Sequence, residues 1–461
     1  MKLKLSSLAA ATKKSQIMLL LALMISSVAL AQNPLVTHIY TADPTARVHE
    51  GKLYIYPSCD IVPTKEDGKK GFVMPGYHIF SLEGGSTWHD YGMTLHCDQV
   101  PWGEKGTNSM WAPDCIEKDG KYYYYYPAKP LNDRAFRRIG VGISDSPSGP
   151  FEWEPTFIDG VSGIDPGLLL DDADNQAYLF FGGGQELFVA PLGDDMKSIT
   201  EPAIKIEGLP AGYKEGSFPI KIDGVYYLTF AHVFADEGYT IGYATSDNPM
   251  GPYLYRGKIM DNIAQGTNHH SIVKYKDQWI LFYHFWHISG VNKMRSMCAD
   301  YMHFKPDGTI AKVKPTLRGI GSPMQGDTIQ IDRYNTIHKA QTAMVSGDEP
   351  TGWMVCEAEA YSNVTFNDVD FGDGTAKKML ARVACGQRFG EIQIRTNGPQ
   401  GELIATFPLH YTGGWDKWVT LESDILAPIT GKHNICAVFI GEGGSTKIAN
   451  LNWLLMPHDQ K

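Results

Sequence analysis

A short aromatic strand that follows a Gly- or Asp-containing turn occurs five times between residues 50 and 281. The copies lie at residues 50–56, 119–124, 174–180, 223–228 and 276–281. A repeat of roughly 50 to 70 residues that consists of strands and turns is typical of a β-propeller, in which each copy forms one blade. Long helical periodicity is missing, whereas 48 Gly and 27 Pro residues supply many turns. The sequence therefore predicts an all-β fold that begins with a five-bladed β-propeller.

A second repeat supports the blade pattern. Residues 144–151 read Ser-Asp-Ser-Pro-Ser-Gly-Pro-Phe, and residues 246–253 read Ser-Asp-Asn-Pro-Met-Gly-Pro-Tyr. The two copies begin 102 residues apart, which is close to two blade lengths. Because Pro and Gly favour tight turns, each copy is expected to connect two strands at the same place in its blade.

The first 31 residues have the pattern of a secretory signal. Four lysines precede an apolar run over residues 17–31, which ends in Ala29-Leu30-Ala31, a small-x-small cleavage pattern. The run is short for a spanning helix, and no later run is long enough to cross a bilayer. The sequence therefore predicts residues 1–31 as a signal peptide and an exported protein, periplasmic or extracellular.

The charge limits the kind of partner. Loss of the four lysines of the signal changes the formal net charge from −10 to −14. Such a surface repels nucleic acid and anionic membranes and suits a neutral substrate. The seven Cys residues are odd in number and widely spaced, which argues against a disulfide framework and a zinc site. We expect most of them to be buried, although one or two bridges remain open in an exported protein.

Changes in pattern along the chain indicate two domains. The propeller is expected over residues 34–328. The polar segment 329–352 lacks clear strand alternation and is expected to be a linker. Residues 353–461 then alternate apolar and polar side chains between Gly-rich turns, which predicts a jelly-roll-like β-sandwich.

A polar group lies upstream of each repeated strand, namely Asp43, Asp114, Asp165, Glu215 and His270. Equivalent positions in successive blades converge on the propeller axis, so these groups are expected to meet. Asp43 and Asp165 each precede Pro, which holds the backbone rigid, although Asp-Pro is also common in ordinary turns. In the second blade, Asp114 is one candidate for the axis, and Trp111 is preferred as an aromatic platform for a sugar ring.

Three carboxyl groups around one pocket suggest hydrolysis of a glycosidic bond. One group must stay protonated to donate to the leaving oxygen, and another must be ionised to activate water; burial and mutual repulsion can separate their pKa values. Carboxyl groups about 6.5–9.5 Å apart leave room for that water, and the anomeric centre then inverts. His270 is open to three uses: metal ligand, proton shuttle or buried core residue.

Over residues 34–328 the chain resembles glycoside hydrolase family 43. The resemblance rests on Ala42-Asp43-Pro44, Trp111-Ala112-Pro113, Asp165-Pro166 with Asp171-Asp172, Glu215-Gly216 and Tyr283-His284. It implies a five-bladed propeller and an inverting enzyme that acts on α-L-arabinofuranosyl or β-D-xylosyl linkages. Ser217, where the family often has Pro, and the 171–175 turn, which lacks the usual Asp-Gly, leave the substrate open.

The same resemblance implies a role for each site residue. Asp43 would be the general base and Glu215 the general acid, while Asp165 would orient Glu215 and keep its pKa high. Arg295 would bind substrate. His270 would stand beside an axial calcium ion that is held largely through water.

The second domain resembles carbohydrate-binding module family 6, at residues 356–359 and 451–453. Glu357 and Glu359 are expected on the same face of one strand, where paired oxygen ligands would hold a structural calcium; simple solvent-exposed alternation is the alternative. Trp415, in a Gly-rich loop, would stack on sugar, with Phe366 as a candidate opposing platform. Trp418 is expected in the core.

Together these features predict a monomeric inverting glycoside hydrolase that releases α-L-arabinofuranosyl or β-D-xylosyl residues from plant cell-wall oligo- or polysaccharides. An endo-arabinanase or a galactan-directed hydrolase on the same scaffold is one alternative. A non-catalytic sugar-binding propeller is another, which the presence of all three carboxyl groups disfavours. An invertase-like enzyme is disfavoured because the Asn-Asp-Pro motif is absent before Asp43.

Overall fold

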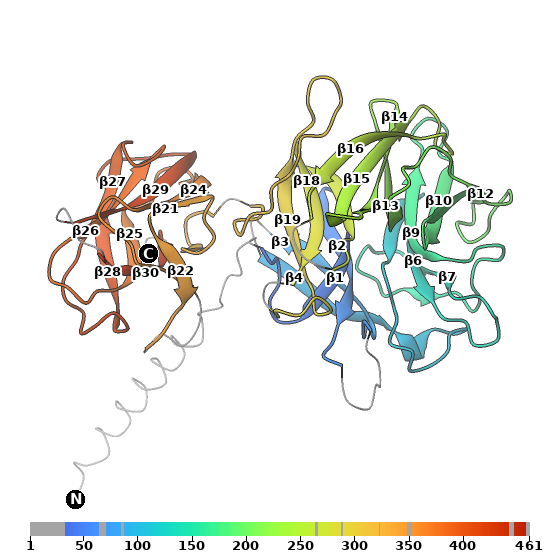
Figure 1. Ribbon diagram of the computed structural model, residues 1–461, viewed down its shortest axis with the longest axis horizontal. Helices are drawn as coiled ribbons and strands as arrows, with labels where there is room; N and C mark the ends of the chain where they lie inside the picture. The colour runs from blue at the N-terminus through green and yellow to red at the C-terminus, as the bar shows by residue number, and fades with distance from the viewer. Residues whose placement is uncertain are drawn as a thin grey trace, which may run out of the picture.

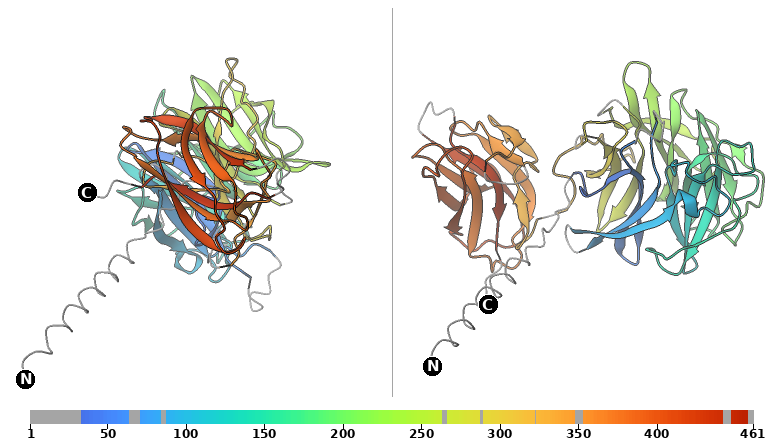
Figure 2. Two further views of the ribbon diagram at one scale, coloured as in Figure 1. Left: turned by 90° about the vertical axis from the view of Figure 1, so that its left-hand side faces the viewer. Right: turned by 90° about the horizontal axis from the view of Figure 1, so that it is seen from below.

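The structure is a computed structural model of the full chain. It describes residues 33–63, 71–83, 87–262, 266–286, 289–321, 323–347, 353–441 and 447–457. The predicted signal peptide, residues 1–31, lies outside the described residues. Two all-β bodies follow one another along the chain and lie side by side (Figures 1 and 2).

The first body consists of five antiparallel sheets in the described residues. The first sheet has the order β1 (Tyr40–His49), β2 (Lys52–Asp60), β3 (Gly76–Glu83), β4 (Thr87–His96). The second sheet, which follows the short 3-10 helix η1 (Cys97–Gln99), has the order β5 (Asp114–Lys118), β6 (Lys121–Ala128), β7 (Arg138–Ser144), β8 (Glu152–Trp153). The third sheet holds β9 (Ile164–Leu170), β10 (Ala177–Gly183), β11 (Glu186–Pro191), β12 (Ile204–Lys205). The fourth holds β13 (Tyr213–Ile222), β14 (Val225–Phe234), β15 (Gly238–Ser246), β16 (Leu254–Met260), and the fifth holds β17 (His270–Tyr275), β18 (Gln278–Phe285), β19 (Ser296–Met302).

The sheets follow one another around a ring, as in a propeller. The first strands β1, β5, β9 and β13 each contact the first strand of the next sheet, β13 contacts β17, and β17 returns to contact β1. A separate apolar cluster fills the space between each pair of neighbouring sheets, including the pair formed by the fifth sheet and the first. The first strands therefore line the centre of this body, where side chains from distant segments can meet.

The repeated sequences occupy equivalent places in the sheets. The Gly- or Asp-containing turns connect the first strand of a sheet to the second, as in the turns 50–51, 119–120 and 223–224. Both residues of these turns have positive φ, between 49° and 82°. Two successive residues with positive φ form the turn that matches the twist of a β-hairpin, which explains the recurring Gly. The 144–151 and 246–253 repeats connect β7 to β8 and β15 to β16, as expected.

The second body is a sandwich of two antiparallel sheets, which confirms the predicted β-sandwich class. One sheet has the order β22 (Gln341–Met344), β23 (Trp353–Cys356), β30 (Asn450–Leu455), β25 (Lys378–Ala384), β28 (Trp418–Asp424), with β20 (Thr328–Gln330) also paired to β30. The other has the order β21 (Thr336–His338), β24 (Asn363–Asp370), β29 (Lys432–Ile440), β26 (Glu391–Thr396), β27 (Leu403–Pro408). One apolar core lies between the two sheets.

The prediction that residues 329–352 form a linker is wrong for residues 329–347, which the structure describes. Three short strands lie there or at its edge: β20 pairs with β30, β21 with β24, and β22 with β23. All three pairs belong to the sandwich. The strands β21 and β22 lie at sheet edges, and their side chains are exposed or half-buried, so their sequence shows no apolar alternation. That lack of alternation is why the sequence suggested a linker.

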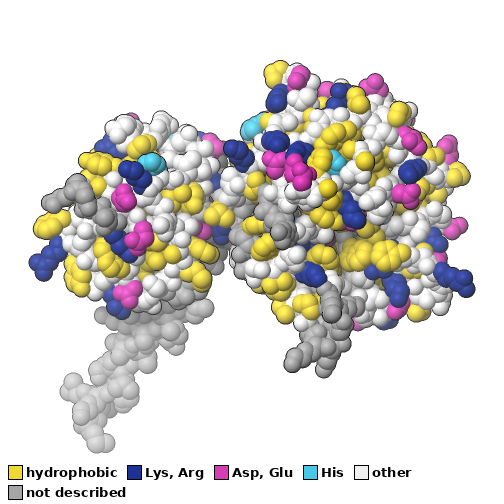
Figure 3. Space-filling view, in the orientation of Figure 1, with side chains coloured by type: hydrophobic (Ala, Val, Ile, Leu, Met, Phe, Trp, Pro, Cys, Tyr) yellow, Lys and Arg dark blue, Asp and Glu magenta, His cyan; other side chains and the backbone are white. Residues whose placement is uncertain are grey.

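Three further observations concern the molecule as a whole. All seven Cys residues are buried and unpaired. On the face shown in Figure 3, Lys, Arg, Asp and Glu side chains are scattered over both bodies. Among the described residues, no helix has the length and apolar character needed to cross a membrane.

Candidate active site

The three predicted carboxyl residues line one cavity of about 300 Å³. Asp43 belongs to β1, Asp165 to β9 and Glu215 to β13, so each comes from the first strand of a different sheet. Trp111 and Arg295 line the same cavity. The structure therefore brings together five residues that the sequence placed in one pocket.

Local backbone irregularity directs these side chains. Asp43 and Asp165 have positive φ values of 50° and 54°, and the β1–β2 register shifts between Ala42 and Thr45. The β13–β14 register also shifts on both sides of Glu215. A bulge of this kind turns a side chain away from the regular alternation of the strand. Both residues with positive φ lie near the start of an inner strand, and both line the cavity.

The Asp43 carboxyl group is held in its ionised form. Its Oδ1 accepts a hydrogen bond from Arg295 Nη1 at 3.1 Å, and its Oδ2 accepts one from Ser58 Oγ at 2.5 Å. The Asp43 backbone N–H donates to His284 Nδ1 at 3.1 Å. Burial alone would raise the pKa of Asp43, but the Arg295 charge, nearby His269 and His284, and the Ser58 hydrogen bond outweigh it and lower this pKa to about 2.

Arg295 is itself fixed by Asp60, a residue that the sequence analysis did not single out. Arg295 Nε and Nη2 donate to the two Asp60 carboxylate oxygens, each at 2.9 Å, and the Arg295 backbone N–H donates to Asp60 Oδ2 at 2.8 Å. The ring of Phe72 lies 4.4 Å from the guanidinium carbon. This two-point contact holds the Arg295 side chain rigidly beside Asp43.

Glu215 and Asp165 have the opposite electrostatic environment. Burial raises the pKa of both groups; for Asp165 the Glu215 and Asp43 carboxyls raise it further, and for Glu215 Asp43 does. Tyr239 donates its hydroxyl hydrogen to Glu215 Oε1 at 3.1 Å, and the Gly216 N–H donates to Asp165 Oδ2 at 2.9 Å. The two carboxyls repel each other's charge, so the pair retains a proton to a higher pH than isolated carboxyls do.

The alternative axial candidate in the second sheet, Asp114, does not line this cavity. Its carboxylate accepts hydrogen bonds from Arg47 Nε at 3.0 Å, from the Leu168 N–H at 2.7 Å and from the Cys115 N–H at 2.7 Å. Asp114 therefore connects β1, β5 and β9 instead. Trp111 lines the cavity, as the sequence analysis predicted when it preferred Trp111 to Asp114.

His270 lies in the core at the start of β17 and is fully buried. Its Nε2 lies 2.8 Å from Thr229 Oγ1, whereas its Nδ1 has no hydrogen-bond partner among the described residues. Burial, with the nearby His269 and His284, lowers the pKa of His270 well below its usual value, so the ring is neutral. A neutral ring with one free nitrogen fits a contact to a hydrated calcium ion.

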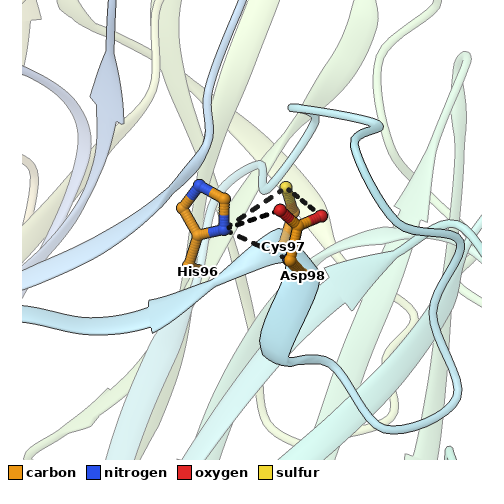
Figure 4. A group of neighbouring side chains, drawn as sticks. All are labelled: His96, Cys97 and Asp98. Carbon is orange, nitrogen blue, oxygen red and sulfur yellow. Dashed lines mark hydrogen bonds and ion pairs between the residues drawn. The ribbon is translucent and has the colours of Figure 1, made fainter.

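The described residues contain one cluster of three metal-ligand-type side chains, His96, Cys97 and Asp98, and Figure 4 shows them at one end of η1. Local hydrogen bonds already use their polar atoms. The Asp98 N–H donates to His96 Nδ1 at 3.2 Å, and Asp98 Oδ1 accepts from the Gly106 N–H at 2.6 Å. Cys97 Sγ donates to Asn108 Oδ1 at 3.4 Å. The cluster is a cap for the short helix.

The second-domain calcium ligands are not arranged as predicted. Glu357 and Glu359 lie beyond the end of β23, and Glu357 has a φ of 48°, so the pair does not share a face of a strand. Both side chains are exposed. Glu357 Oε1 lies 2.6 Å from Lys447 Nζ. The Glu357 carboxylate is thus paired with an ammonium group, and the prediction that the two glutamates share one face of a strand is wrong.

Trp415, the predicted sugar platform of the second domain, is half-buried. A Cβ added to Gly386 would lie 2.4 Å from ring atoms of Trp415, so this ring packs flat against the backbone. Lys447 Nζ lies 4.7 Å from the ring centroid. Phe366, the candidate opposing platform, is fully buried in the core, so that prediction is wrong. Trp418 is buried as expected, and its Nε1 donates to Ser346 O at 2.9 Å.

The propeller-type fold and an axial cavity with carboxyl groups of contrasting pKa are the features of a sugar hydrolase, and comparison with known proteins defines the family. The model for glycosyl hydrolases family 43 matches residues 31–310, and the model for carbohydrate binding module (family 6) matches residues 325–456. The chain belongs to glycoside hydrolase family 43, with a family 6 module after it, as the sequence resemblance indicated.

Several named relatives cover the first domain. Xylosidase/arabinosidase 43A of Humicola insolens is 36% identical over 333 residues, which span 61% of this chain and 99% of that protein. The xylosidase/arabinosidase of Bacteroides ovatus is 34% identical over 318 residues, spanning 60% of this chain and 95% of that protein. These matches cover nearly the whole length of both relatives.

Two solved structures are similar in fold. The first is a β-xylosidase/α-arabinofuranosidase from a compost microbial metagenome, solved with xylotriose in a calcium-free form. It has a TM-score of 0.56 and 37% identity, and the match covers 62% of this chain and 98% of that one. The second is an arabinoxylan arabinofuranohydrolase from Bacillus subtilis, with a TM-score of 0.53 and 24% identity, covering 94% of this chain and all of that one. The second likeness extends the shared fold through both domains.

Proposed function

We propose that this protein is an inverting glycoside hydrolase that removes single β-D-xylosyl or α-L-arabinofuranosyl residues from plant cell-wall saccharides. The observation that carries this proposal is the contrast between Asp43, whose pKa is about 2, and the pair Asp165 and Glu215, whose pKa values are raised. An ionised base and a protonated acid in one cavity are the two groups that this chemistry needs. The names of the relatives support the choice of sugars.

In this mechanism Asp43 accepts a proton from a water molecule as that water attacks the anomeric carbon. Glu215 donates its proton to the glycosidic oxygen, which leaves with the rest of the substrate. Asp165 would orient Glu215 through the Gly216 N–H, and repulsion between the two carboxyl groups would keep a proton on the pair between turnovers. Arg295 and Trp111 position the sugar ring in the cavity.

The size of the cavity favours release of terminal sugars. At about 300 Å³ it lies at the lower end of the range for ligand pockets, roughly 300–1,000 Å³. An endo-acting arabinanase or galactan-directed enzyme would need an open groove for several sugars on each side. A non-catalytic sugar-binding propeller would not need an ionised Asp43 and a protonated Glu215 in the same cavity.

The remaining features of the proposal concern the whole protein. The five sheets would be the blades of one closed five-bladed propeller, since the first strands contact one another around the ring. His270 would face a hydrated calcium ion at the axis, which would supply positive charge behind the cavity. The second domain would bind carbohydrate. Export to the periplasm or the exterior and a monomeric state complete the proposal.

The test compares nitrophenyl β-D-xyloside, α-L-arabinofuranoside and β-D-galactofuranoside with xylobiose, using the wild-type protein, Asp43→Asn and Glu215→Gln. We expect the wild-type protein to cleave the xyloside or the arabinofuranoside and to release first the inverted anomer, observed by proton NMR. Asp43→Asn should lower kcat on every substrate by about 10²–10⁴-fold. Glu215→Gln should lose much more on xylobiose than on the nitrophenyl glycosides, because nitrophenolate leaves without a proton.

Three results would contradict the proposal. Retained anomeric configuration would exclude the water-mediated single displacement. A wild-type turnover rate for Asp43→Asn would show that Asp43 is not the general base. Equal losses by Glu215→Gln on both kinds of leaving group would show that Glu215 does not donate the proton.

A further inference from the structure

The strongest unassigned feature near the cavity is an exposed aromatic side chain, Phe136. Phe136 is 66% exposed to solvent, which is one of the highest values among the large apolar residues of the first domain. The Phe136 ring lies 5.6 Å from the ring of Trp111, with an angle of 54° between the planes. Trp111 lines the cavity, so Phe136 continues the aromatic surface from the cavity to the outside.

Arg137 holds the two rings in place. Its guanidinium carbon lies 4.4 Å from the centroid of Trp111 and 4.4 Å from that of Phe136. Arg137 is only 6% exposed, so its charge is sheltered between the rings. A guanidinium over an aromatic face stabilises the arrangement, and more strongly when it is desolvated.

The loop that carries Phe136 is also ordered by its own contacts. Asp133 Oδ2 accepts hydrogen bonds from Arg138 Nε at 2.9 Å and Nη2 at 2.7 Å, and Asp133 Oδ1 accepts from the Ala135 N–H at 2.7 Å. On the other side, Arg137 O accepts from Gly163 N–H at 3.3 Å, two residues before Asp165. The exposed ring is therefore attached to the backbone that positions a catalytic carboxyl.

An exposed aromatic ring on a fixed loop has a physical use in a sugar hydrolase. A ring of this size gains free energy when another molecule covers it, because apolar surface is then removed from water. The C–H face of a pyranose can stack on an aromatic ring. Phe136 contacts Trp111 and does not itself line the cavity, so it is placed to contact a part of the substrate that projects from the cavity past Trp111.

We propose that Phe136 is the platform for the leaving-group sugar, the residue next to the scissile bond on the side away from the cavity. This inference rests on the proposed function and adds a residue that selects for oligosaccharides over substrates with a small leaving group. Arg137 is a positioning residue here, since it contacts the two rings and acts on the sugar through them.

The experiment measures kcat and KM for β-D-xylosyl fluoride and for xylobiose with the wild-type protein, Phe136→Ala and Phe136→Tyr. Xylosyl fluoride has the same terminal sugar but no leaving-group ring. Phe136→Ala should lower kcat/KM for xylobiose by about three- to ten-fold, mainly through KM, and should change the fluoride by less than about two-fold. Phe136→Tyr should retain nearly all xylobiose activity. Leu254→Ala is the matched control, because Leu254 is 60% exposed on β16 of another sheet.

Equal losses on the fluoride and on xylobiose would overturn the proposal, because they would indicate a distorted cavity. Unchanged xylobiose kinetics in Phe136→Ala would also overturn it. A change in sedimentation of Phe136→Ala would assign the ring to contact between copies of the chain and would overturn it as well. If the wild-type protein hydrolyses neither xylosyl substrate but cleaves nitrophenyl α-L-arabinofuranoside, this inference is overturned and the proposed function stands. Failure on all three substrates would overturn both, whereas the other outcomes leave the proposed function intact.

Discussion

At the scale of single residues, the partners of each carboxyl group decide its ionisation. Asp43 and Glu215 occupy similar places on β1 and β13, and burial alone raises the pKa of both. Asp43 Oδ1 accepts a hydrogen bond from the charged Arg295 at 3.1 Å, whereas Glu215 Oε1 accepts one from the neutral hydroxyl of Tyr239. The different neighbours therefore separate two chemically similar groups into a base and an acid.

The Tyr239 hydrogen bond gives a prediction about pH dependence. This bond stabilises the ionised form of Glu215 and lowers its pKa, so Tyr239→Phe should raise that pKa. Activity requires protonated Glu215. The activity is therefore present at pH values below the pKa of Glu215 and is lost as the pH rises through that pKa. The alkaline limb of the kcat profile should therefore move to higher pH, with the plateau changed by less than about ten-fold.

The measurement is a kcat–pH profile on xylobiose for the wild-type protein and Tyr239→Phe. Tyr411→Phe serves as a control, because Tyr411 is exposed in the second domain and its hydroxyl donates to Gly413 O. An alkaline limb that moves to lower pH, or does not move, would be inconsistent with the role given to Tyr239.

The sequence predicted some of these residues and missed others for a physical reason. Asp43, Asp165 and Glu215 recur at one place relative to a repeated strand, so their position in space follows from the repeat. Asp60 reaches the site only through its contact with Arg295, 235 residues away, and Tyr239 lines the cavity from β15, outside the first strand of its sheet. Such contacts leave no local pattern. The only available hint for Asp60 was its place four residues after the first repeated segment, 50–56.

At the scale of strands, one buried carboxylate joins three sheets. Asp114 is 1% exposed and accepts hydrogen bonds from Arg47 of β1 and from the Leu168 N–H of β9. Arg47 Nη2 also donates to Leu168 O at 2.9 Å. These contacts fix the inner strands relative to one another, so they hold the frame on which Asp43 and Asp165 are mounted.

Asp114→Ala should therefore destabilise the first domain. The substitution removes the carboxylate partner of Arg47 and the acceptor of the Leu168 and Cys115 N–H groups, which costs about 3–5 kcal/mol in free energy of unfolding. Urea denaturation followed by tryptophan fluorescence measures this difference. Asp145→Ala removes an exposed partner of Lys121 and should change stability by less than about 1 kcal/mol. Equal effects of the two substitutions would contradict the assignment of Asp114.

The strands could be predicted where both repetition and burial recur. The hairpins of the five sheets were visible because turn residues and aromatic residues repeat. The strands β20, β21 and β22 were not, since they are short and pair at or near sheet edges. Backbone hydrogen bonds hold such strands in place, so their side chains give little indication that the segment is a strand.

At the scale of the whole molecule, the strand pairing sets the true start of the second domain. Its sandwich includes β20, β21 and β22, which precede residue 353. A fragment of residues 321–461 should therefore unfold cooperatively on heating. A fragment of residues 353–461 should not, because β30, β24 and β23 would each lose a paired strand. Calorimetry and circular dichroism compare the two.

Cooperative unfolding of the shorter fragment would place the boundary where the sequence pattern first suggested it. The class and the order of the two domains could be predicted from the sequence, whereas this boundary could not. The contacts that tie the domains together are also invisible in the sequence, as with Arg318, whose Nη2 donates to Gly321 O at 2.8 Å and lies near Asn367 O.

The apolar cluster between the fifth sheet and the first contains Leu35 and Val36 from the start of the domain and Ile320 from its end. Asn33 Nδ2 adds hydrogen bonds to Ala299 O at 2.9 Å and Thr316 O at 2.8 Å. During synthesis, Leu35 and Val36 leave the ribosome early, whereas Ile320 is added nearly three hundred residues later. The cluster that joins the fifth sheet to the first can form only after that point. Assembly of the catalytic centre is thus deferred until synthesis of the domain is finished, since Asp43 and Arg295 meet across that same seam.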